Sequence, residues 1–333
     1  MKFLIIGLGS MGKRRIRNLQ SLNENEIIGF DTNIERCNEA IEKYGIEAYS
    51  DFSKCLSKKP NAFVISTPPD LHMKYAKEAL KNKIHFFTEA SVIQDEMIDV
   101  IKELKFSDIV GLPSCTMRYH PIVKKINELL NTEQIGKVLA FFHHSGQYLP
   151  DWHPWEDYRK FYVSKRETGA CREIVPFELV WLISTFGKIK SVFADSDKVS
   201  NLQADIDDIY NTVLEFKNGV KGILTVDVIA RVPIRQLKIL TENGMITADW
   251  YQNKVSCFSI ESGWREFEIN SGKPEEGYIH GEKMYVQEME HFIKSIKKET
   301  TQNYTFSEDM DILKILEKIE NSSDHGTKEL IQN

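Results

Sequence analysis

The stretch KFLIIGLGSMGKRR, residues 2–15, decides how the first part of the chain folds. A short apolar run leads directly into Gly7, Gly9 and Gly12, and a helical pattern follows. Gly7 allows a tight turn, Gly9 lets backbone approach a pyrophosphate, and Gly12 permits close packing of helix on strand. The helix N-terminus adds N–H groups and the positive end of its dipole. The stretch therefore predicts a dinucleotide site made of Gly7, Leu8, Gly9, Ser10, Met11 and Gly12.

An acid, Asp31, ends the second predicted strand. Its distance from the glycines suits a carboxylate that accepts a hydrogen bond from a ribose 2′-OH. The same charge would repel a 2′-phosphate, so NAD is favoured over NADP. Arg36 and the Lys13–Arg15 cluster could rescue NADP if they fold over the ribose, so NADP stays the less favoured alternative. Thr32, the next residue, is assigned to the same site.

The first 115 or so residues alternate short apolar runs with helical periodicities. Continuous apolar strands separated by helices indicate a parallel sheet covered on both faces. Gly45 and Asn82 are expected as helix C-caps. The predicted strands are residues 2–7, 26–31, 62–67, 84–89 and 108–113, and the predicted helices are residues 11–22, 33–45, 70–82 and 94–105.

Beyond a helix at residues 117–130 the pattern changes to longer, alternating strands, which indicate a largely antiparallel sheet. Lys217-Asn218-Gly219 and Glu242-Asn243-Gly244 are strong hairpin signals. We therefore expect a Rossmann domain over residues 1–118 and a second, α+β domain over residues 119–333, with C-terminal helices able to pack back on the first domain. The predicted strands are residues 136–147, 189–197, 208–219, 220–230, 234–244 and 245–252, and the predicted helices are residues 168–187, 280–299 and 307–322.

Composition excludes several functions. A formal charge of -6 over 333 residues gives no general attraction to nucleic acid or anionic membrane. No apolar stretch approaches a membrane span and no signal peptide precedes the first strand, so we expect a cytoplasmic protein. The basic cluster Lys13-Arg14-Arg15 with Arg17 is interpreted as a solvated helix face. We predict no disulfide framework and no metal site, since the five cysteines are scattered: Cys37, Cys55, Cys115, Cys171 and Cys257.

The third apolar run ends in STPPDLH, residues 66–72. Two prolines after a strand force an extended exit at the carboxyl edge, where open α/β sheets bind ligands. We assign Ser66, Thr67, Pro68 and His72 to the cofactor site. With GLGSMG, this T-P-x-x-x-H, RYHP at 118–121 and IGKV at 135–138, essentially the whole chain resembles the Gfo/Idh/MocA family of sugar and inositol oxidoreductases.

The resemblance implies a Rossmann domain, a C-terminal open-faced sheet through which the protein forms a homodimer or homotetramer, and hydride transfer between NAD(P) and a hydroxyl-bearing ring. It also places Glu89 and Arg118 near the cofactor. Two departures stand out. Where the family usually has Glu-Lys-Pro, this chain has Glu89-Ala90-Ser91 and lacks the proton-handling lysine. Where the family commonly has Asp and then His, the chain has Glu173 and Phe177, and phenylalanine cannot transfer a proton.

The stretch SGQYLPDWHPWEDYRKFY, residues 145–162, offers replacements. Aromatic platforms beside polar groups suit sugar rings, so Trp152, Trp155 and Arg159 are assigned to the substrate. His153 has a suitable intrinsic pKa for proton transfer, and Tyr158 is the second choice. The alternative is that this aromatic segment only packs onto the sheet or fills a subunit interface.

The helix at residues 168–187 supplies further candidates. Arg172 could orient an anionic group of the substrate, and Glu173, Phe177 and Glu178 are assigned to the substrate. The acids Glu173 and Glu178 could equally be ordinary helix-surface residues. His143 and His144 are adjacent on a strand and point to opposite faces, so they do not form a metal pair.

Two functions fit this pattern. The first is an NAD-dependent oxidoreductase acting on a sugar, sugar acid or nucleotide sugar, with Glu89 near the nicotinamide and His153 or Tyr158 handling the proton. The second is a non-catalytic protein of the same fold that binds NAD and a sugar as a sensor or partner subunit. The missing lysine and histidine motivate the second function.

Overall fold

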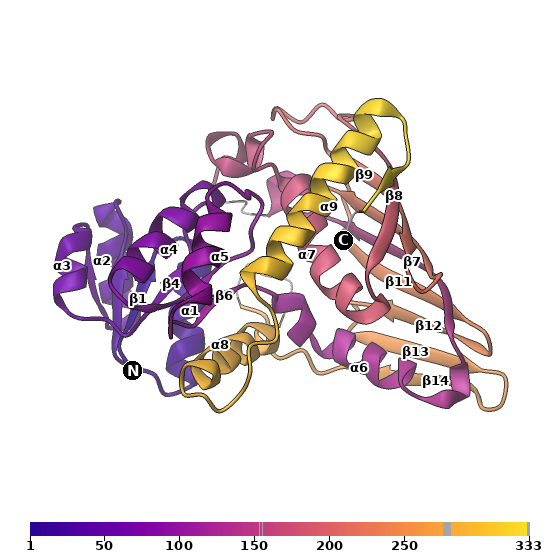
Figure 1. Ribbon diagram of the computed structural model, residues 1–333, viewed down its shortest axis with the longest axis horizontal. Helices are drawn as coiled ribbons and strands as arrows, with labels where there is room; N and C mark the ends of the chain where they lie inside the picture. The colour runs from indigo at the N-terminus through magenta and orange to yellow at the C-terminus, as the bar shows by residue number, and fades with distance from the viewer. Residues whose placement is uncertain (153, 155, 276–280, 332–333) are drawn as a thin grey trace. The chain divides into compact units, whose positions relative to one another are not determined.

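The computed structural model describes residues 1–152, 154, 156–275 and 281–331 (Figure 1). Two compact units divide the chain. The N-terminal unit consists of Met1–Thr116 together with Tyr285–Asp311, and the C-terminal unit consists of Met117–Met284 and Ile312–Asn333. The division therefore comes two residues before the expected boundary and assigns Tyr285–Asp311 to the N-terminal unit.

The N-terminal unit contains a six-stranded parallel sheet in the order β3-β2-β1-β4-β5-β6, which confirms the predicted Rossmann fold. Strand order reverses between β1 and β4, the switch point at which such sheets bind ligands. One strand, β3, and one helix, α3, were not predicted, because both are very short. The strands are β1 (Phe3–Ile6), β2 (Ile27–Phe30), β3 (Glu47–Tyr49), β4 (Ala62–Ile65), β5 (His85–Thr88) and β6 (Gly111–Pro113), and the helices are α1 (Ser10–Ser21), α2 (Ile34–Tyr44), α3 (Phe52–Ser57), α4 (His72–Lys81) and α5 (Met97–Lys105).

Local signals explain these elements. The four residues of β1, β2 and β4 are buried on both faces, as expected of a covered parallel sheet. Gly45 ends α2 in the left-handed conformation and Asn82 ends α4, as predicted. The helix α5 begins at Met97, three residues later than predicted.

Two returning helices complete the N-terminal unit, α8 (Lys283–Ile296) and the first turns of α9 (Phe306–His325). Met289, Phe292 and Ile293 of α8 belong to the same apolar core as Phe3, Ile5 and Val64. Phe306 packs against Phe86 with ring centroids 5.6 Å apart. The core of the dinucleotide fold is therefore closed by a segment that returns at Tyr285, after the chain has left this unit at Thr116.

The C-terminal unit is built on a nine-stranded sheet in the order β14-β13-β12-β11-β7-β10-β9-β8-β15. All pairings are antiparallel except β7 with β10, which confirms a mostly antiparallel sheet. Both predicted hairpins form, at β9–β10 and β11–β12. The strands are β7 (Val138–Gly146), β8 (Ile189–Asp197), β9 (Ile209–Phe216), β10 (Lys221–Asp227), β11 (Ile234–Thr241), β12 (Gly244–Asp249), β13 (Lys254–Ser259), β14 (Gly263–Glu268) and β15 (Glu329–Leu330).

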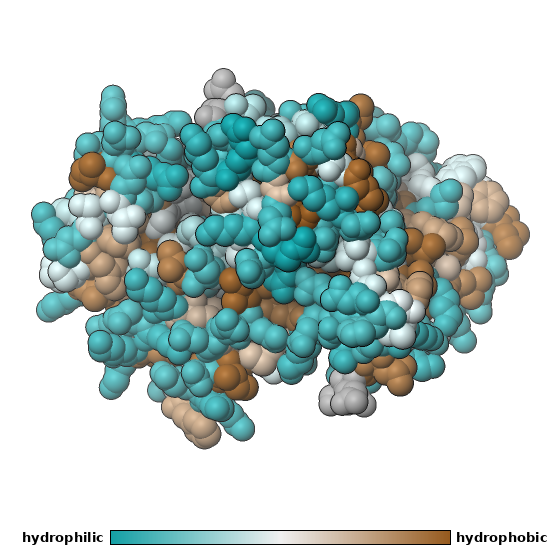
Figure 2. Space-filling view, turned by 90° about the horizontal axis from the view of Figure 1, so that it is seen from above, coloured by the Kyte–Doolittle hydropathy of each residue, from teal (hydrophilic) through white to brown (hydrophobic). Residues whose placement is uncertain are grey.

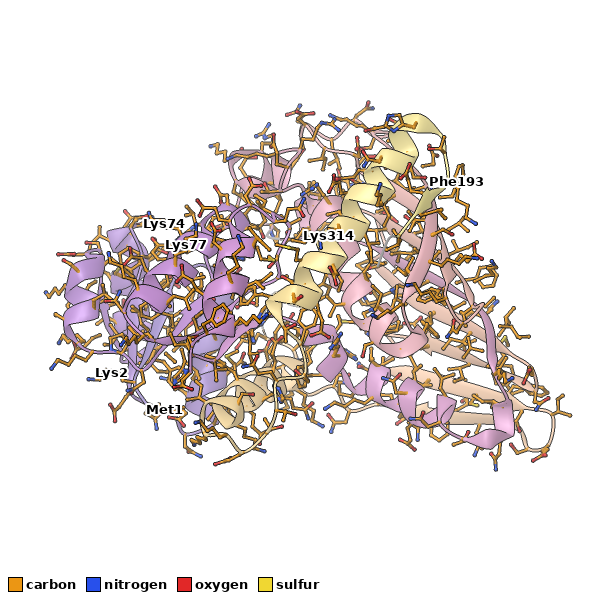
Figure 3. All side chains as sticks on the ribbon, viewed as in Figure 1. Met1, Lys2, Lys74, Lys77, Phe193 and Lys314 are labelled. Atoms are coloured by element: carbon orange, nitrogen blue, oxygen red, sulfur yellow. The ribbon has the colours of Figure 1, made fainter. Side chains whose placement is uncertain are left out.

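Helices cover one face of this sheet (Figure 1). They are α6 (Pro121–Leu130), which lies against β13, and α7 (Ala170–Phe186), which lies against β9 and β10. The core between them contains stacked aromatic rings, such as Phe141 on Phe186 with centroids 4.3 Å apart. In Figure 3 the labelled Phe193 on β8 lies on the other, outer side of the sheet. No described helix is long and apolar enough to cross a membrane.

A buried acid in α9 makes the stability of the N-terminal unit depend on pH. Burial raises the pKa of Asp309 to about 6 from its ordinary value of 3.8, although Ser91 and Tyr304 oppose the shift. The folded state therefore holds this proton more tightly than the unfolded state. Asp309 contributes most to the free energy of unfolding below pH 4. This contribution, roughly 3 kcal/mol in total, is lost as the pH rises to about 6.

We predict that Asp309→Asn becomes stabilising relative to the wild type as the pH rises from 4 to 7. Urea unfolding at several pH values measures the difference between the two proteins. Asp324→Asn, at an exposed position of the same helix, is the matched control and should give a flat difference. A difference that does not change with pH for Asp309→Asn would contradict the prediction.

Candidate functional site

The glycine loop has the geometry of a phosphate cradle. Gly7 has φ of +91° and lies so close to β4 that an added Cβ would be 2.6 Å from the Ser66 carbonyl oxygen. A Cβ on Gly12 would be 1.8 Å from the Gly7 carbonyl oxygen, so this position accepts no side chain. A Cβ on Gly9, by contrast, would meet only the Arg36 guanidinium, at 3.9 Å. The space over Gly9 and the following turn of Ser10 and Met11 is thus left for a ligand.

Asp31 ends β2 beside this loop and is tied to it. Its Oδ2 accepts from the Leu8 N–H at 2.8 Å, and its Oδ1 accepts from the Asn33 N–H at 2.8 Å. Arg36 lies 3.7 Å from the same carboxylate and is half-exposed. The carboxylate keeps lone pairs for a ribose hydroxyl, with the exposed Thr32 next to it. The residues present therefore fit the adenosine half of a dinucleotide.

The carboxyl end of β4 supplies the next part of the site. Ser66 and Thr67 are partly exposed, and Pro68 is exposed. Within the described part of the chain the buried hydroxyl of Thr67 has no hydrogen-bond partner, so it is available to a ligand. His72 is buried and its Nε2 contacts the Thr67 carbonyl oxygen at 2.9 Å. This contact lets the buried His72 fix the turn from the protein side, and burial lowers the pKa of His72.

The basic cluster after the glycine loop is not a solvated face, and that interpretation is wrong for Arg14 and Arg15, which are both buried. Arg15 is fully buried and binds Glu89 in a bidentate pair, Nε to Oε1 at 2.7 Å and Nη2 to Oε2 at 2.8 Å. The Ser66 hydroxyl donates to Glu89 at 3.1 Å. A cation therefore does accompany Glu89, but it comes from α1 and not from the neighbouring residue.

The same guanidinium binds a second acid, Glu288 of α8, at 2.8 Å. Glu288 also accepts from the Ser114 hydroxyl at 3.0 Å, the Cys115 N–H at 2.7 Å and the Thr116 hydroxyl at 2.7 Å. The pKa of Glu288 is raised from its ordinary value, mainly by burial, although Arg15 opposes the shift. We call Arg15, Glu89 and Glu288 the arginine cluster. It joins α1 to α8 and to the ends of β5 and β6.

A sequence signal for the cluster exists. Arg15 follows Gly12 by three residues and precedes Leu19 by four, so it stands on the buried stripe of α1. Glu288 likewise stands among Tyr285, Met289 and Phe292 on the apolar stripe of α8. A charged residue on an apolar stripe calls for an opposite charge elsewhere. The partners are 273 residues apart, however, and nothing local connects them.

In the C-terminal unit, α7 presents Glu173 and Phe177 on a partly exposed face, one turn apart. Glu173 accepts from the Tyr162 hydroxyl at 3.3 Å. Glu178 was assigned to the substrate, and the structure corrects this, since its side chain is 0% exposed. It is bound by His143 at 2.8 Å and Trp181 at 2.6 Å, with Arg235 at 2.8 Å. Glu178 is a structural acid of the core.

Arg172 also has a partner within its own unit. It forms a two-pronged pair with Glu320 of α9, at 2.6 and 3.3 Å, and donates to the Glu167 carbonyl oxygen. These contacts engage its guanidinium, and the assignment of Arg172 to an anionic group of the substrate stays a prediction. Arg118 belongs to the C-terminal unit and donates to the Val180 carbonyl oxygen at 3.2 Å.

Only part of the aromatic segment at residues 145–162 can be placed, since His153 and Trp155 lie outside the described residues. Trp152 is partly buried. The Tyr158 hydroxyl accepts from the Gln203 N–H at 3.1 Å. Arg159 is exposed and pairs with Asp157 at 2.7 Å.

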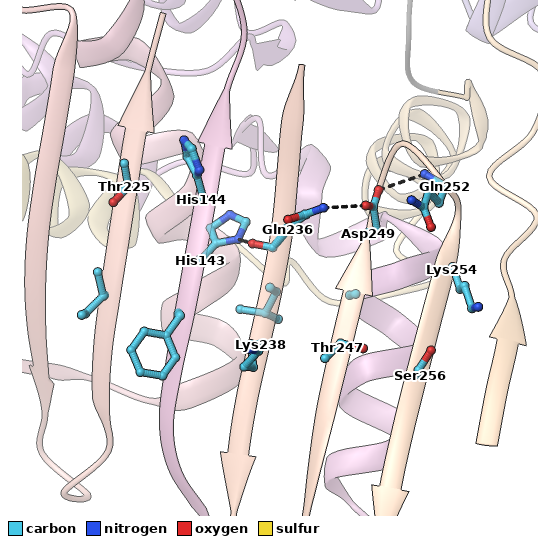
Figure 4. A pocket seen from close by; sticks show the side chains of 14 residues that line it. His143, His144, Thr225, Gln236, Lys238, Thr247, Asp249, Gln252, Lys254 and Ser256 are labelled. Atoms are coloured by element: carbon cyan, nitrogen blue, oxygen red, sulfur yellow. Dashed lines mark hydrogen bonds between the residues drawn. The ribbon is translucent and has the colours of Figure 1, made fainter. Parts of the chain in front are cut away.

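A hollow of about 670 Å³ lies on the outer face of the C-terminal sheet, across β10, β7, β11, β12 and β13 (Figure 4). On one side of it the partly exposed His144 bonds to Asp227 at 2.6 Å. On the other, Gln236 donates to Asp249 at 2.8 Å. Among the described residues no group of three histidine, cysteine or acidic side chains could hold a metal ion.

Comparison with known proteins agrees with this geometry. A family model described as "Oxidoreductase family, NAD-binding Rossmann fold" matches residues 1–95, and one described as "GFO/IDH/MocA C-terminal domain" matches residues 123–247. Oxidoreductase P35 of Formosa agariphila is 23% identical over 244 residues, which cover 70% of this chain and 71% of that protein.

Solved structures share the fold over nearly the full length. Levoglucosan dehydrogenase with NADH and levoglucosan has a TM-score of 0.85 at 18% identity, covering 100% of each chain. The WlbA dehydrogenase of Bordetella pertussis with NADH and UDP-GlcNAcA has a TM-score of 0.80 at 16% identity, covering 100% of this chain and 99% of that one. GenD2 from gentamicin A biosynthesis, in complex with NAD, has a TM-score of 0.82 at 16% identity, covering 100% and 97%.

We predict that Glu178→Gln destabilises the C-terminal unit by roughly 3 kcal/mol, because Arg235 would remain buried without its counter-charge. Burial alone would raise the pKa of Glu178, but Arg235 and His143 lower it, so the acid is ionised in the folded protein. Urea unfolding followed by tryptophan fluorescence measures the loss. Glu173→Gln, on the partly exposed face of the same helix, should cost less than about 1 kcal/mol. Equal losses of unfolding free energy in the two variants would contradict the assignment of Glu178 as a structural acid of the core.

Proposed function

Because the chain belongs to the Gfo/Idh/MocA family of oxidoreductases, we propose that it transfers a hydride between NAD and a hydroxyl-bearing carbon of a sugar, sugar acid or nucleotide sugar. The proposal rests on one observation. Groups able to bind a ligand lie in series along the carboxyl edge of the N-terminal sheet. The open backbone at Gly9, the Asp31 carboxylate and the Thr67 hydroxyl follow one another from β1, β2 and β4. The dehydrogenases whose structures share this fold were solved with sugar-type compounds, which supports the substrate class.

The residues of the N-terminal unit would hold NAD in a definite direction. Asp31 and Thr32 would bind the adenosine ribose, and the N-terminus of α1 with Gly9 would bind the pyrophosphate. The nicotinamide half then extends over β4 and β5, toward Thr67 and Glu89. Bound NAD supplies the hydride chemistry. Glu89 keeps its place there because Arg15 and Ser66 hold both of its oxygens.

Proton handling must differ from the usual family pattern, because Ala90 and Phe177 carry no titratable group. We assign it to His153 first and Tyr158 second, with Trp152, Trp155 and Arg159 as the sugar platform. Tyr158 suits the task chemically, since its oxygen is fixed by the Gln203 N–H while its own proton stays available for donation. Turnover of a verified sugar should fall by at least about a hundredfold in His153→Ala or in Tyr158→Phe. Unchanged turnover in both variants would remove the assignment.

Ala90 and Phe177 also favour a second function. With Ala90 and Phe177 the chain could bind NAD and a sugar without exchanging a hydride. The two functions differ in one observable. An enzyme reduces bound NAD when its sugar is added, which raises the absorbance at 340 nm, whereas a sensor changes only its affinity for the second ligand.

Cofactor choice gives a direct prediction. The wild type should bind NADH at least about tenfold more tightly than NADPH, because Asp31 repels a 2′-phosphate. Asp31→Ser should reduce the difference between the dissociation constants of NADH and NADPH. Arg36 should then contribute to NADPH binding. Fluorescence titration of both nucleotides measures the ratio, with Glu35→Ser, at an exposed acid in the first turn of α2, as the control. Tighter binding of NADPH by the wild type would contradict the role given to Asp31.

The outer face of the C-terminal sheet supports a second part of the proposal, a homodimer or homotetramer formed through it. Four exposed apolar side chains lie directly beside one another across four strands, in the register Phe193, Val213, Ile223 and Phe142. They are 45%, 47%, 40% and 45% exposed. Figure 2 shows hydrophobic side chains at the surface of the right-hand end, where this sheet lies in Figure 1. A second copy of the chain, related by a two-fold axis, would bury the row against itself.

We predict that Ile223→Asp lowers the mass of the particle in solution by at least half, because it places a charge in the middle of the row. Light scattering after size-exclusion chromatography measures the mass. Ile34→Asp, at an exposed isoleucine of the N-terminal unit, should leave the mass unchanged. A monomeric wild type would exclude this interface.

A further inference from the structure

The arginine cluster carries an excess of negative charge at the nicotinamide end of the proposed NAD site. Arg15 is fully buried and contributes one positive charge, while Glu89 and Glu288 contribute two negative charges. Four donors converge on Glu288, from Arg15, Ser114, Cys115 and Thr116, which is the environment of an ionised carboxylate. Arg14, which is also buried, is not one of these three residues, and its guanidinium lies over the Tyr285 ring, 4.2 Å from the centroid.

The position of the cluster follows from the direction of the dinucleotide. Asp31 after β2 takes the adenosine ribose, and the turn after β1 takes the pyrophosphate. The other half must therefore extend across the switch point toward β4 and β5. Glu89 directly follows β5, and its amide bonds to Ile65 at the end of β4. Where the resembling family has a lysine, the next residue here is Ala90, so no cation follows Glu89 in the chain.

The oxidised nicotinamide ring carries a positive charge and the reduced ring does not, whereas the two phosphates are the same in both forms. We propose that the arginine cluster, through the excess charge of Glu288 and Glu89, makes this protein bind NAD⁺ in preference to NADH. Tighter binding of the oxidised form makes bound NADH a stronger reductant. The favoured reaction is reduction of a carbonyl: the hydride of NADH goes to the carbonyl carbon, a proton goes to its oxygen, and NAD⁺ and a carbinol result.

The inference rests on the proposed NAD site, and the test separates the two. The dissociation constants of NAD⁺ and NADH are measured by calorimetry and by fluorescence for the wild type and three variants. Glu288→Gln and Glu89→Gln each remove one negative charge, so the ratio of NADH to NAD⁺ dissociation constants should fall by about tenfold in each. This is the effect of one unit charge within about 10 Å at an effective dielectric constant of about 20.

Arg15→Lys is the matched control. It disturbs the same contacts but conserves the charge of the cluster, so both dissociation constants should change together and their ratio should stay constant. A purely structural cluster would move the two constants in parallel in all three variants, and a Glu288 that already holds a proton would give no change in Glu288→Gln. Either result overturns the inference while leaving the NAD site intact. If neither nucleotide binds the wild type, the proposed function itself fails.

Discussion

The buried guanidinium of Arg15 is the interaction on which the N-terminal unit depends most. It binds two acids from distant parts of the chain, Glu89 and Glu288, and it is completely removed from solvent. Desolvation makes such a group costly, and loss of either acid would leave an uncompensated charge. The arrangement therefore constrains α1, the ends of β5 and β6, and α8 together. Together with the apolar packing of α8, it holds Tyr285–Asp311 in the N-terminal unit.

The two units differ in how closely they follow the family pattern. The N-terminal unit keeps the glycine loop, the acid after β2 and the polar turn after β4, all at the carboxyl edge of a parallel sheet. The C-terminal unit keeps its sheet and the helix α7, but the partly exposed Phe177 stands on that helix where the resemblance expects a histidine. Ala90 and Phe177 carry no titratable group, while the glycine loop and Asp31 of the N-terminal unit follow the family pattern. A chain of this kind can keep its cofactor while its substrate chemistry changes.

Most of the fold could be predicted because its turns, helix caps and hairpins are determined by residues close together in the sequence. The glycine spacing, the Gly45 cap and the two Asn-Gly hairpins each follow from backbone geometry within a few residues. Arg15 and Glu178 were misread for the opposite reason. Arg15 was taken as solvent-facing and Glu178 as substrate-binding, but the partners of both come from strands and helices far away in the sequence.

The central claim is hydride transfer between NAD and a sugar, and isotopic labelling tests it most directly. NADH carrying deuterium on either face of nicotinamide C4 is incubated with the protein and a set of keto-sugars, sugar acids and nucleotide sugars, and the sugars are then analysed by mass spectrometry. The account predicts that one of the two labelled faces delivers deuterium to a carbon of at least one sugar, and that Tyr158→Phe or His153→Ala slows the transfer. A sugar that binds together with NADH while the label never leaves the nicotinamide would contradict the account and identify a binding protein.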